Sequence, residues 1–205
     1  MPDVPSPVYI AFEGPEGCGK STQARRLADS LGALLTRETG GTPIGERLRA
    51  ILHDVTVTDL DERAETLIVA ADRAQHLAQV VRPALAAGRD VVTDRSVYSA
   101  LAYQGWGREL SVDDVRRVNE WAVGDTWPHL VVLLDADDAV LESRMSGRDL
   151  DRFEREGTAF HDRVRTGFRT MAAADPEHWV CLDAALDADA IEVAVRAAVQ
   201  ERLGR

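Results

Sequence analysis

The glycine loop at residues 14–21, GPEGCGKS, constrains the fold of this chain more than any other segment. It matches the pattern G-x-x-x-x-G-K-[ST] at every position, and it stands between an apolar run at 8–12 and a stretch at 21–31 with apolar residues at helical spacing. A glycine loop between a buried strand and a helix binds polyphosphate, because its backbone N–H groups converge on the anion at the helix N-terminus. A simple glycine turn is the alternative, and the Lys-Ser pair and the flanking elements disfavour it.

The composition describes one domain with a substantial core, because the chain has 205 residues of which 45% are hydrophobic. No apolar stretch approaches the roughly 18 residues of a membrane span. Residues 1–7 lack the basic start of a signal peptide, so we expect a disordered lead-in there and no membrane partner. The net charge of −11 disfavours a nucleic-acid partner. Cys18 and Cys181 give no disulfide framework, which predicts a cytoplasmic location.

Short apolar runs alternate with helical patterns along the whole chain. We expect strands at 8–13, 33–37, 90–94, 130–135 and 179–183, and helices near 21–31, 44–53, 60–87, 112–123, 139–145, 158–174 and 188–203. This alternation predicts an α/β fold, a three-layer sandwich in which a five-stranded parallel sheet carries helices on both faces. No linker interrupts it, so we expect a single domain over 1–205. Ligands of such folds bind at the carboxyl ends of the strands.

Charged residues follow the predicted strands at the edge where a ligand is expected. Glu13 ends the first strand, Arg37 and Glu38 follow the second, and Asp94 and Arg95 follow the third. A carboxylate there can hold Mg²⁺, and an arginine can stabilise charge on phosphoryl groups. A surface ion pair is the alternative for Asp94 and Arg95, but the neighbouring phosphate loop favours a functional role.

Three further segments allow two interpretations each. Arg73, in the helix predicted at 60–87, either points into the cleft or lies on a solvated helix face, and spacing alone favours the solvated face. The segment at 99–105, SALAYQG, carries groups suited to a nucleobase pocket, although a buried tyrosine packed on a helix is the simpler interpretation. The arginine-rich, glycine-bounded stretch at 146–157 is predicted to be a mobile lid, with a solvated charged helix as the alternative.

Taken together, the motifs resemble those of the thymidylate kinases, which have the P-loop nucleoside monophosphate kinase fold. The resemblance extends from Phe12 to about Asp183, and it is carried by FEG at 12–14, GKST at 19–22, RETGGT at 37–42, ADR at 71–73, DR at 94–95, AYQG at 102–105 and LDRFE at 150–154. It implies an enzyme that phosphorylates dTMP to dTDP with ATP, by in-line phosphoryl transfer and with Mg²⁺ as cofactor. It also implies a homodimer, for which the long helix at 60–87 is a candidate surface.

The resemblance assigns roles to individual residues. Those expected to bind ATP are Gly14, Pro15, Glu16, Gly17, Cys18, Gly19, Lys20, Ser21, Thr22 and Arg148. Those expected to bind dTMP are Glu16, Arg37, Glu38, Arg49, Val69, Arg73, Arg95, Ser99, Ala100, Tyr103 and Gln104. The expected metal residues are Ser21, Glu13 and Asp94, and the expected catalytic residues are Lys20, Arg95 and Arg152.

Several of these roles are more specific. Arg73 and Gln104 match residues that read the thymine edge, and Tyr103 matches one that crowds the 2′ position of the sugar. Arg152 matches a lid arginine of family members that lack an arginine in the phosphate loop, and Gly17 stands at that loop position here.

Three positions depart from the family pattern. Thr39 replaces a common proline, Val69 replaces an aromatic ring that often stacks on the base, and Ala100 replaces a polar residue that often touches the base. These departures leave open a kinase for another nucleoside or deoxynucleoside monophosphate. A P-loop NTPase switch is a rival from a different class, and the sequence lacks the Asn/Thr-Lys-x-Asp segment that would read guanine.

Overall fold

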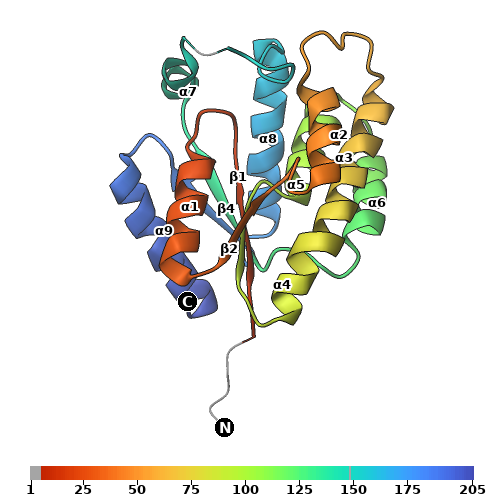
Figure 1. Cartoon of the computed structure of the whole chain (residues 1–205). Coiled ribbons are helices and arrows are strands. Elements are labelled where there is room, and N and C mark those ends of the chain that lie inside the picture. The colour runs from red at the N-terminus through yellow and green to blue at the C-terminus, as the bar shows by residue number, and fades with distance from the viewer. Residues whose placement is uncertain (1–5, 148) are drawn as a thin grey trace.

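A parallel β-sheet forms the centre of the molecule (Figure 1). The computed structural model describes residues 6–147 and 149–205. Within them the sheet has five strands in the order β2-β3-β1-β4-β5, all paired in parallel. The strands are β1 (Tyr9–Glu13), β2 (Leu34–Arg37), β3 (Val91–Asp94), β4 (Leu130–Asp135) and β5 (Trp179–Asp183). The predicted strands, their parallel pairing and the α/β class are thereby confirmed.

Helical elements connect the strands. They are α1 (Lys20–Leu31), α2 (Pro43–His53), α3 (Glu62–His76), η1 (Leu77–Val81), α4 (Arg82–Ala86), α5 (Val97–Ala100), η2 (Leu101–Gly107), α6 (Val112–Val123), α7 (Asp138–Met145), α8 (Thr158–Ala174) and α9 (Ala188–Leu203). The long helix predicted at 60–87 is continuous, but its middle, η1, is π-helical. The helical segment at 97–107 was not predicted, because its glycines and small residues weaken the amphipathic pattern.

Alternate side chains of β1 pack against helices on opposite faces of the sheet. Ile10 and Phe12 of β1 pack in one apolar cluster with Leu27 of α1 and Val195 of α9. Tyr9, the residue before Ile10, packs in a cluster on the opposite face of the sheet. This period of two is that of a strand buried on both sides. Figure 1 shows the result, with α1 and α9 on one side of the sheet and α2, α3, α4 and α6 on the other.

Side-chain caps fix where α2 and α3 begin. Thr42 precedes Pro43 at the start of α2, and its hydroxyl accepts a hydrogen bond from the Gly45 backbone N–H at 2.9 Å. Asp61 accepts from two backbone N–H groups in the first turn of α3. Such caps satisfy donors that an open helix end leaves unpaired. Both helices therefore start at defined residues and present fixed faces to the strand ends.

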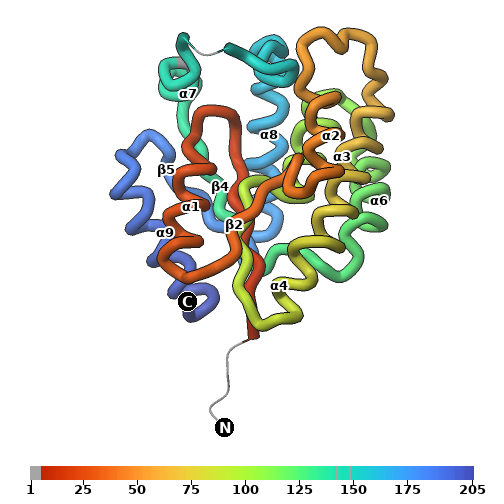
Figure 2. The backbone as a smooth tube through the Cα atoms, in the orientation of Figure 1, coloured from red at the N-terminus to blue at the C-terminus, as the bar shows by residue number. Residues whose placement is uncertain are grey.

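The phosphate loop joins β1 to α1 at the carboxyl edge of the sheet. Gly14 adopts a φ of +140°, and a Cβ there would lie 2.2 Å from the backbone oxygen of Leu134. Only glycine fits such an approach. Figure 2 shows that the segment joining α2 to α3 and the segment before α8 lie at the same end of the molecule as this loop.

Two sequence-based expectations concern the N-terminal lead-in and a membrane span. Of the lead-in predicted at 1–7, residues 1–5 lie outside the described part of the chain, and 6–7 have no regular structure. Among the described residues, no helix combines the length and the apolar character needed to cross a bilayer.

Candidate functional site

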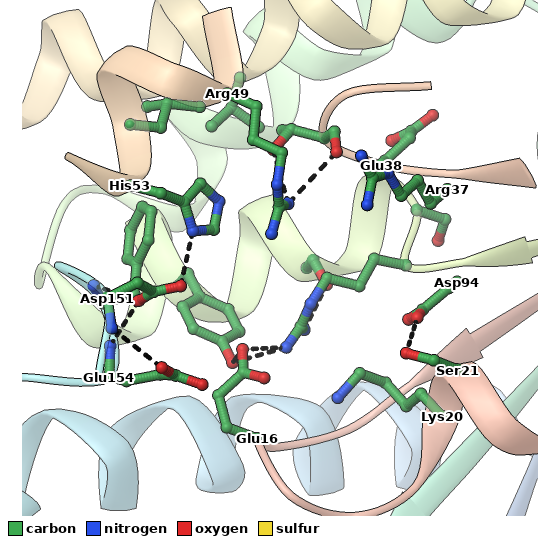
Figure 3. A pocket seen from close by; sticks show the side chains of 18 of the residues that line it. Glu16, Lys20, Ser21, Arg37, Glu38, Arg49, His53, Asp94, Asp151 and Glu154 are labelled. Atoms are coloured by element: carbon green, nitrogen blue, oxygen red, sulfur yellow. Dashed lines mark hydrogen bonds and ion pairs between the residues drawn. The ribbon is translucent and has the colours of Figure 1, made fainter. Parts of the chain in front are cut away.

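A polar pocket with a volume of about 560 Å³ lies at the carboxyl edge of the sheet, and Figure 3 shows it from close by. It brings together most of the residues that the sequence singled out. The predicted residues that line it are Glu16, Gly17, Gly19, Lys20, Ser21, Thr22, Arg37, Glu38, Arg49, Val69, Arg73, Asp94, Arg95, Ser99, Ala100, Tyr103 and Gln104. The wall also contains residues to which the sequence analysis gave no binding role, namely Thr39, Leu52, His53, Ser96, Arg144, Asp149, Asp151, Phe153 and Glu154.

Other predicted site residues do not line this pocket. Gly14, Pro15 and Cys18 belong to the loop backbone behind it, and Glu13 and Arg152 point elsewhere. Arg148 lies outside the described residues.

The phosphate loop presents Lys20 and Ser21 to the pocket. The Lys20 Nζ donates to the backbone oxygen of Pro15 at 2.7 Å and lies 3.6 Å from the Cys18 sulfur. The Ser21 hydroxyl donates to the Asp94 carboxylate at the end of β3 (Figure 3). An ammonium group, a hydroxyl and a carboxylate thus line the pocket beside the loop. Oxygen ligands of this kind suit a hard cation such as Mg²⁺.

Arg95 extends from the end of β3 to the phosphate loop, where its guanidinium donates to the Gly14 backbone oxygen at 3.3 Å. Its φ of +71° is unusual for a residue with a side chain and directs the guanidinium across the pocket. The guanidinium donates to the Glu16 carboxylate, to the Tyr103 hydroxyl at 3.1 Å and to Ser99 Oγ at 3.0 Å. Burial alone would raise the pKa of Glu16, but Arg95 and Lys20 outweigh it and lower that pKa to about 2. Glu16 is therefore a carboxylate that can only accept hydrogen bonds.

Two cations, Arg37 and Arg49, face the loop from the other wall of the pocket (Figure 3). Arg49 contacts the Thr39 carbonyl oxygen at 3.2 Å, and Arg95, which contacts the loop, lies close enough to repel it. Burial lowers the pKa of the Arg49 guanidinium, and repulsion from Arg37 and Arg95 lowers it further. Cations held together against their mutual repulsion form a site for an anion. This cluster and the phosphate loop give the pocket two anion-binding walls.

Arg73 is buried, so the prediction from spacing of a solvated helix face is wrong. The side chain is 2% exposed because α3 packs against both α2 and α6. Its Nε donates to Glu38 at 2.8 Å and a terminal nitrogen donates to the Ser96 backbone oxygen at 2.9 Å, while the other contacts Asn119. Glu38 also contacts the His76 ring at 2.9 Å. Burial raises the pKa of Glu38, and Arg73 and His76 overcome that effect and lower it.

Glu38 therefore holds Arg73 with one carboxylate oxygen and contacts His76 with the other. His76 and Asn119 were missed by the sequence analysis. The only signal in the sequence was general: a buried arginine requires acceptors, and these must come from neighbouring elements.

Glu13 is occupied by the segment that follows β3. Its carboxylate accepts hydrogen bonds from the backbone N–H and hydroxyl of both Ser96 and Ser99, at 2.6–3.2 Å. Burial raises its pKa despite the opposing effects of Arg95 and these donors. These four donors already occupy the Glu13 carboxylate, and its expected role as a metal ligand stays a prediction. Among the described residues, no cluster of three His, Cys, Asp or Glu side chains could hold a metal ion alone.

Arg152 lies behind the pocket wall rather than over the phosphate loop. Its Nε donates to the Leu52 backbone oxygen at 2.7 Å, and a terminal nitrogen pairs with the buried Glu65 carboxylate. Glu65 also accepts from the side chains of Gln104 and Arg108. In this arrangement Arg152, the lid arginine expected from the motif, contacts other residues of the protein interior. Glu65 and Arg108 belong to none of the recognised motifs, and the sequence analysis missed them.

The segment that follows α7 closes one side of the pocket. Its described residues between Met145 and Thr158 form turns rather than a helix, so the alternative of a solvated charged helix does not apply to them. Asp151 bonds to the His53 ring at 2.6 Å and caps the turn formed by Phe153 and Glu154 (Figure 3). Tyr103 packs edge-to-face against Phe153, so this tyrosine is both a packing residue and part of the pocket wall.

The chain matches known proteins over nearly its whole length. The family model described as thymidylate kinase matches residues 12–195. A thymidylate kinase of Solidesulfovibrio magneticus is 45% identical over 201 residues, which cover 92% of this chain and 96% of that protein. One from Pseudomonas fluorescens is 45% identical over 204 residues, covering 97% of each. The crystal structure of thymidylate kinase from Ehrlichia chaffeensis superposes with a TM-score of 0.79 at 28% identity, covering 96% of this chain and 99% of that one. The chain belongs to the thymidylate kinase family.

Proposed function

We propose that this chain transfers the γ-phosphoryl group of ATP to dTMP and so forms dTDP. The observation that carries the proposal is the pair of anion-binding walls in one pocket, the phosphate loop with Arg95 on one side and Arg37 with Arg49 on the other. A donor polyphosphate and an acceptor monophosphate can face each other between them. The family of the chain supports dTMP as the acceptor.

In the proposed mechanism the chain positions two phosphates and neutralises the charge that spreads during transfer. An oxygen of the acceptor phosphate attacks the γ-phosphorus in line, and no general base is needed because that phosphate is already ionised. Lys20 and Arg95 supply positive charge next to the transferred group. Ser21 and Asp94 would hold Mg²⁺, which neutralises phosphate oxygens when bound.

The acceptor nucleoside would lie along the wall formed by α3 and η2. Glu16 would accept a hydrogen bond from the 3′-hydroxyl, and Tyr103 would crowd the 2′ position of the sugar. Arg73 and Gln104 would read the base edge. Val69 and Ala100 line the wall where a ring and a polar group would hold the base more tightly. The missing ring costs about 1–3 kcal/mol by the scale of base–aromatic stacking.

A panel of acceptors tests the proposal. Phosphorylation of dTMP, dUMP, dCMP, dGMP and AMP by ATP is measured side by side, and we expect dTMP to have the highest kcat/KM. Preference for another monophosphate would replace dTMP with that acceptor, which is the second candidate function that Val69 and Ala100 keep open. ATP turnover that needs no monophosphate would favour an NTPase switch.

We further propose that residues 146–157 move as a lid and that Arg152 contacts donor phosphates only if it leaves Glu65. Arg144 already lines the pocket and is a second candidate for that role. The lid is tested by comparing amide hydrogen exchange at 149–157 with and without nucleotides. Unchanged exchange would contradict it.

We also propose a cytoplasmic homodimer. Leu67 on α3 and Trp121 on the adjacent α6 are large apolar residues that are 58% and 88% exposed. Light scattering of the purified chain and of a Trp121→Glu variant tests the dimer, which we expect the variant to weaken. Both cysteines are free, which suits a reducing compartment.

A further inference from the structure

Glu65 is a buried carboxylate that the proposed mechanism does not use. It lies on α3 behind the pocket wall and does not line the pocket. One oxygen accepts from Gln104 Nε2 at 2.8 Å and from Arg108 Nε at 3.3 Å. The other accepts from Arg108 at 3.2 Å and from Arg152. Two guanidinium groups thus donate hydrogen bonds to a single buried carboxylate, and the side-chain amide of Gln104 in the pocket wall donates to it as well.

The partnership with Glu65 fixes which way the Gln104 amide faces. A carboxylate paired with two guanidinium groups accepts hydrogen bonds and has none to donate. Gln104 must therefore turn its NH₂ group toward Glu65, which leaves its carbonyl oxygen facing away from that residue. Gln104 lines the pocket, and no donor to its carbonyl oxygen is found in the described part of the chain. The pocket wall thus offers an acceptor at Gln104.

Arg73 offers the opposite polarity on the same wall. Its guanidinium is fixed by Glu38, Asn119 and the Ser96 backbone oxygen, and it can only donate hydrogen bonds. The wall therefore combines a fixed donor with a fixed acceptor. Thymine carries an acceptor at O4 and a donor at N3–H, whereas cytosine carries a donor at N4 and an acceptor at N3. The polarity of the wall matches thymine and opposes cytosine.

We propose that Glu65 is a specificity-determining positioning residue, which selects a 4-oxo over a 4-amino pyrimidine by holding the Gln104 amide in one orientation. This inference rests on the proposed function. Arg108 and Arg152 affect the Gln104 amide only by pairing with Glu65. Arg108 also pairs with Glu156, and Arg152 donates to the Leu52 carbonyl oxygen, so neither guanidinium depends on Gln104 for its position. Gln104 thus contacts the base edge, and Glu65 behind it determines which group of the Gln104 amide the base meets.

The experiment compares dTMP with 5-methyl-dCMP, which differ only at the N3 and C4 positions of the ring. The variant Glu65→Gln keeps the shape of the side chain, but its amide can donate to Gln104 and so permits the Gln104 amide to flip. We expect the ratio of kcat/KM for dTMP over 5-methyl-dCMP to fall about tenfold, as for one mispaired buried polar group, with the KM for ATP unchanged. Binding of both nucleotides without ATP, measured by calorimetry, should show the same change.

Two further variants separate positioning from a merely structural role. Glu62→Gln makes the same chemical change on the same helix at an exposed residue, and it should leave the ratio unchanged. Glu65→Asp keeps an acceptor-only group at a shorter reach, so it should raise the KM for dTMP while the ratio stays within about threefold of the wild type. If Glu65→Gln does not fold, Glu65→Asp alone carries the test.

The outcomes also distinguish this inference from the proposed function. A wild-type chain that does not phosphorylate dTMP would overturn the proposed function. A wild-type chain that prefers dTMP, with Glu65→Gln retaining the full ratio or Glu65→Asp losing it, would overturn only the role of Glu65.

Discussion

The two halves of the pocket are built differently. The donor half, residues 14–22 with Asp94, is a stretch of backbone held by glycine geometry at the end of β1. The acceptor half, formed by α2, α3 and η2, is a set of polar side chains held by other buried side chains. Arg73 is fixed by Glu38 and Asn119, and Gln104 is fixed by Glu65.

This difference predicts how each half responds to mutation. In a site built from backbone, the few side chains that bind the ligand contribute little to folding. Their removal should therefore leave the fold intact. A network of buried charges fails as a unit, because removing one partner leaves another uncompensated. Substitutions in the donor half should therefore lower activity alone, and those in the acceptor half should lower nucleotide affinity and stability together.

The largest expected effect on activity is that of Lys20→Ala in the donor half. Lys20 donates to the Pro15 carbonyl oxygen, and its removal leaves the Glu16 carboxylate still paired with Arg95, so we expect little change in the melting temperature. We expect kcat to fall about 10²–10³-fold, as when one preorganised donor to a developing charge is removed. Steady-state kinetics and thermal melting check both parts. Arg25→Ala, an exposed residue on the same helix, is the control and should keep full activity. A clear loss of stability in Lys20→Ala would contradict the contrast between the halves.

Arg73→Gln should have the next largest effect, and it should act on two quantities at once. It leaves the buried Glu38 with His76 as a partner and without its guanidinium. Breaking a buried ion pair from one side costs about 3–5 kcal/mol of unfolding free energy. We also expect the KM for dTMP to rise by about tenfold or more, with the KM for ATP unchanged. Urea unfolding and kinetics measure the two effects. A variant of wild-type stability would show that Glu38 finds other partners.

The same difference explains how far the sequence alone could predict this molecule. The donor half follows from a local pattern, since the loop, the strand before it and the helix after it are consecutive. The strands ending in Glu13, Arg37 and Asp94 were predicted for a similar reason, because parallel strands place their carboxyl ends at one edge. The pocket was therefore predicted to the level of its main wall residues.

The partners of these residues could not be predicted, because they come from distant parts of the chain. Asn119 lies 46 residues from Arg73, and Glu65 lies 39 residues from Gln104. Spacing along α3 could not show that Arg73 is buried, since that depends on α6 packing against it. The resemblance gave Glu13 a metal role, and the sequence could not show which donors surround its carboxylate. Of the serine donors that occupy Glu13, Ser96 precedes and Ser99 lies in a helical segment that was not predicted.

Arg152→Ala tests whether the segment before α8 belongs to the donor half or to the acceptor half of the pocket. A lid cation that contacts donor phosphates would be part of the donor half, and its loss would lower kcat. The structure joins Arg152 to Leu52 and Glu65 in the acceptor half instead. We therefore expect the KM for dTMP to rise by about three- to tenfold, the scale of one charged hydrogen bond, with a smaller change in kcat. Measurement of both parameters decides, and a tenfold fall in kcat at constant KM would assign Arg152 to the lid role.

The smallest expected effect concerns Glu16, which stands where the two halves meet. Arg95 and Lys20 hold its pKa at about 2 instead of 4.5. A lowered pKa contributes stability that is present above pH 4.5 and is lost as the pH falls toward 2. Below pH 4.5 the wild type should therefore lose unfolding free energy faster than Glu16→Gln, by at most the roughly 1.4 kcal/mol per pH unit that one proton carries. Urea unfolding at pH 6, 4 and 3 measures the difference between the two proteins, which cancels the acidic groups they share. Parallel curves would mean that Glu16 is not coupled to Arg95 in the folded chain, and the two halves would then lack the contact that joins them.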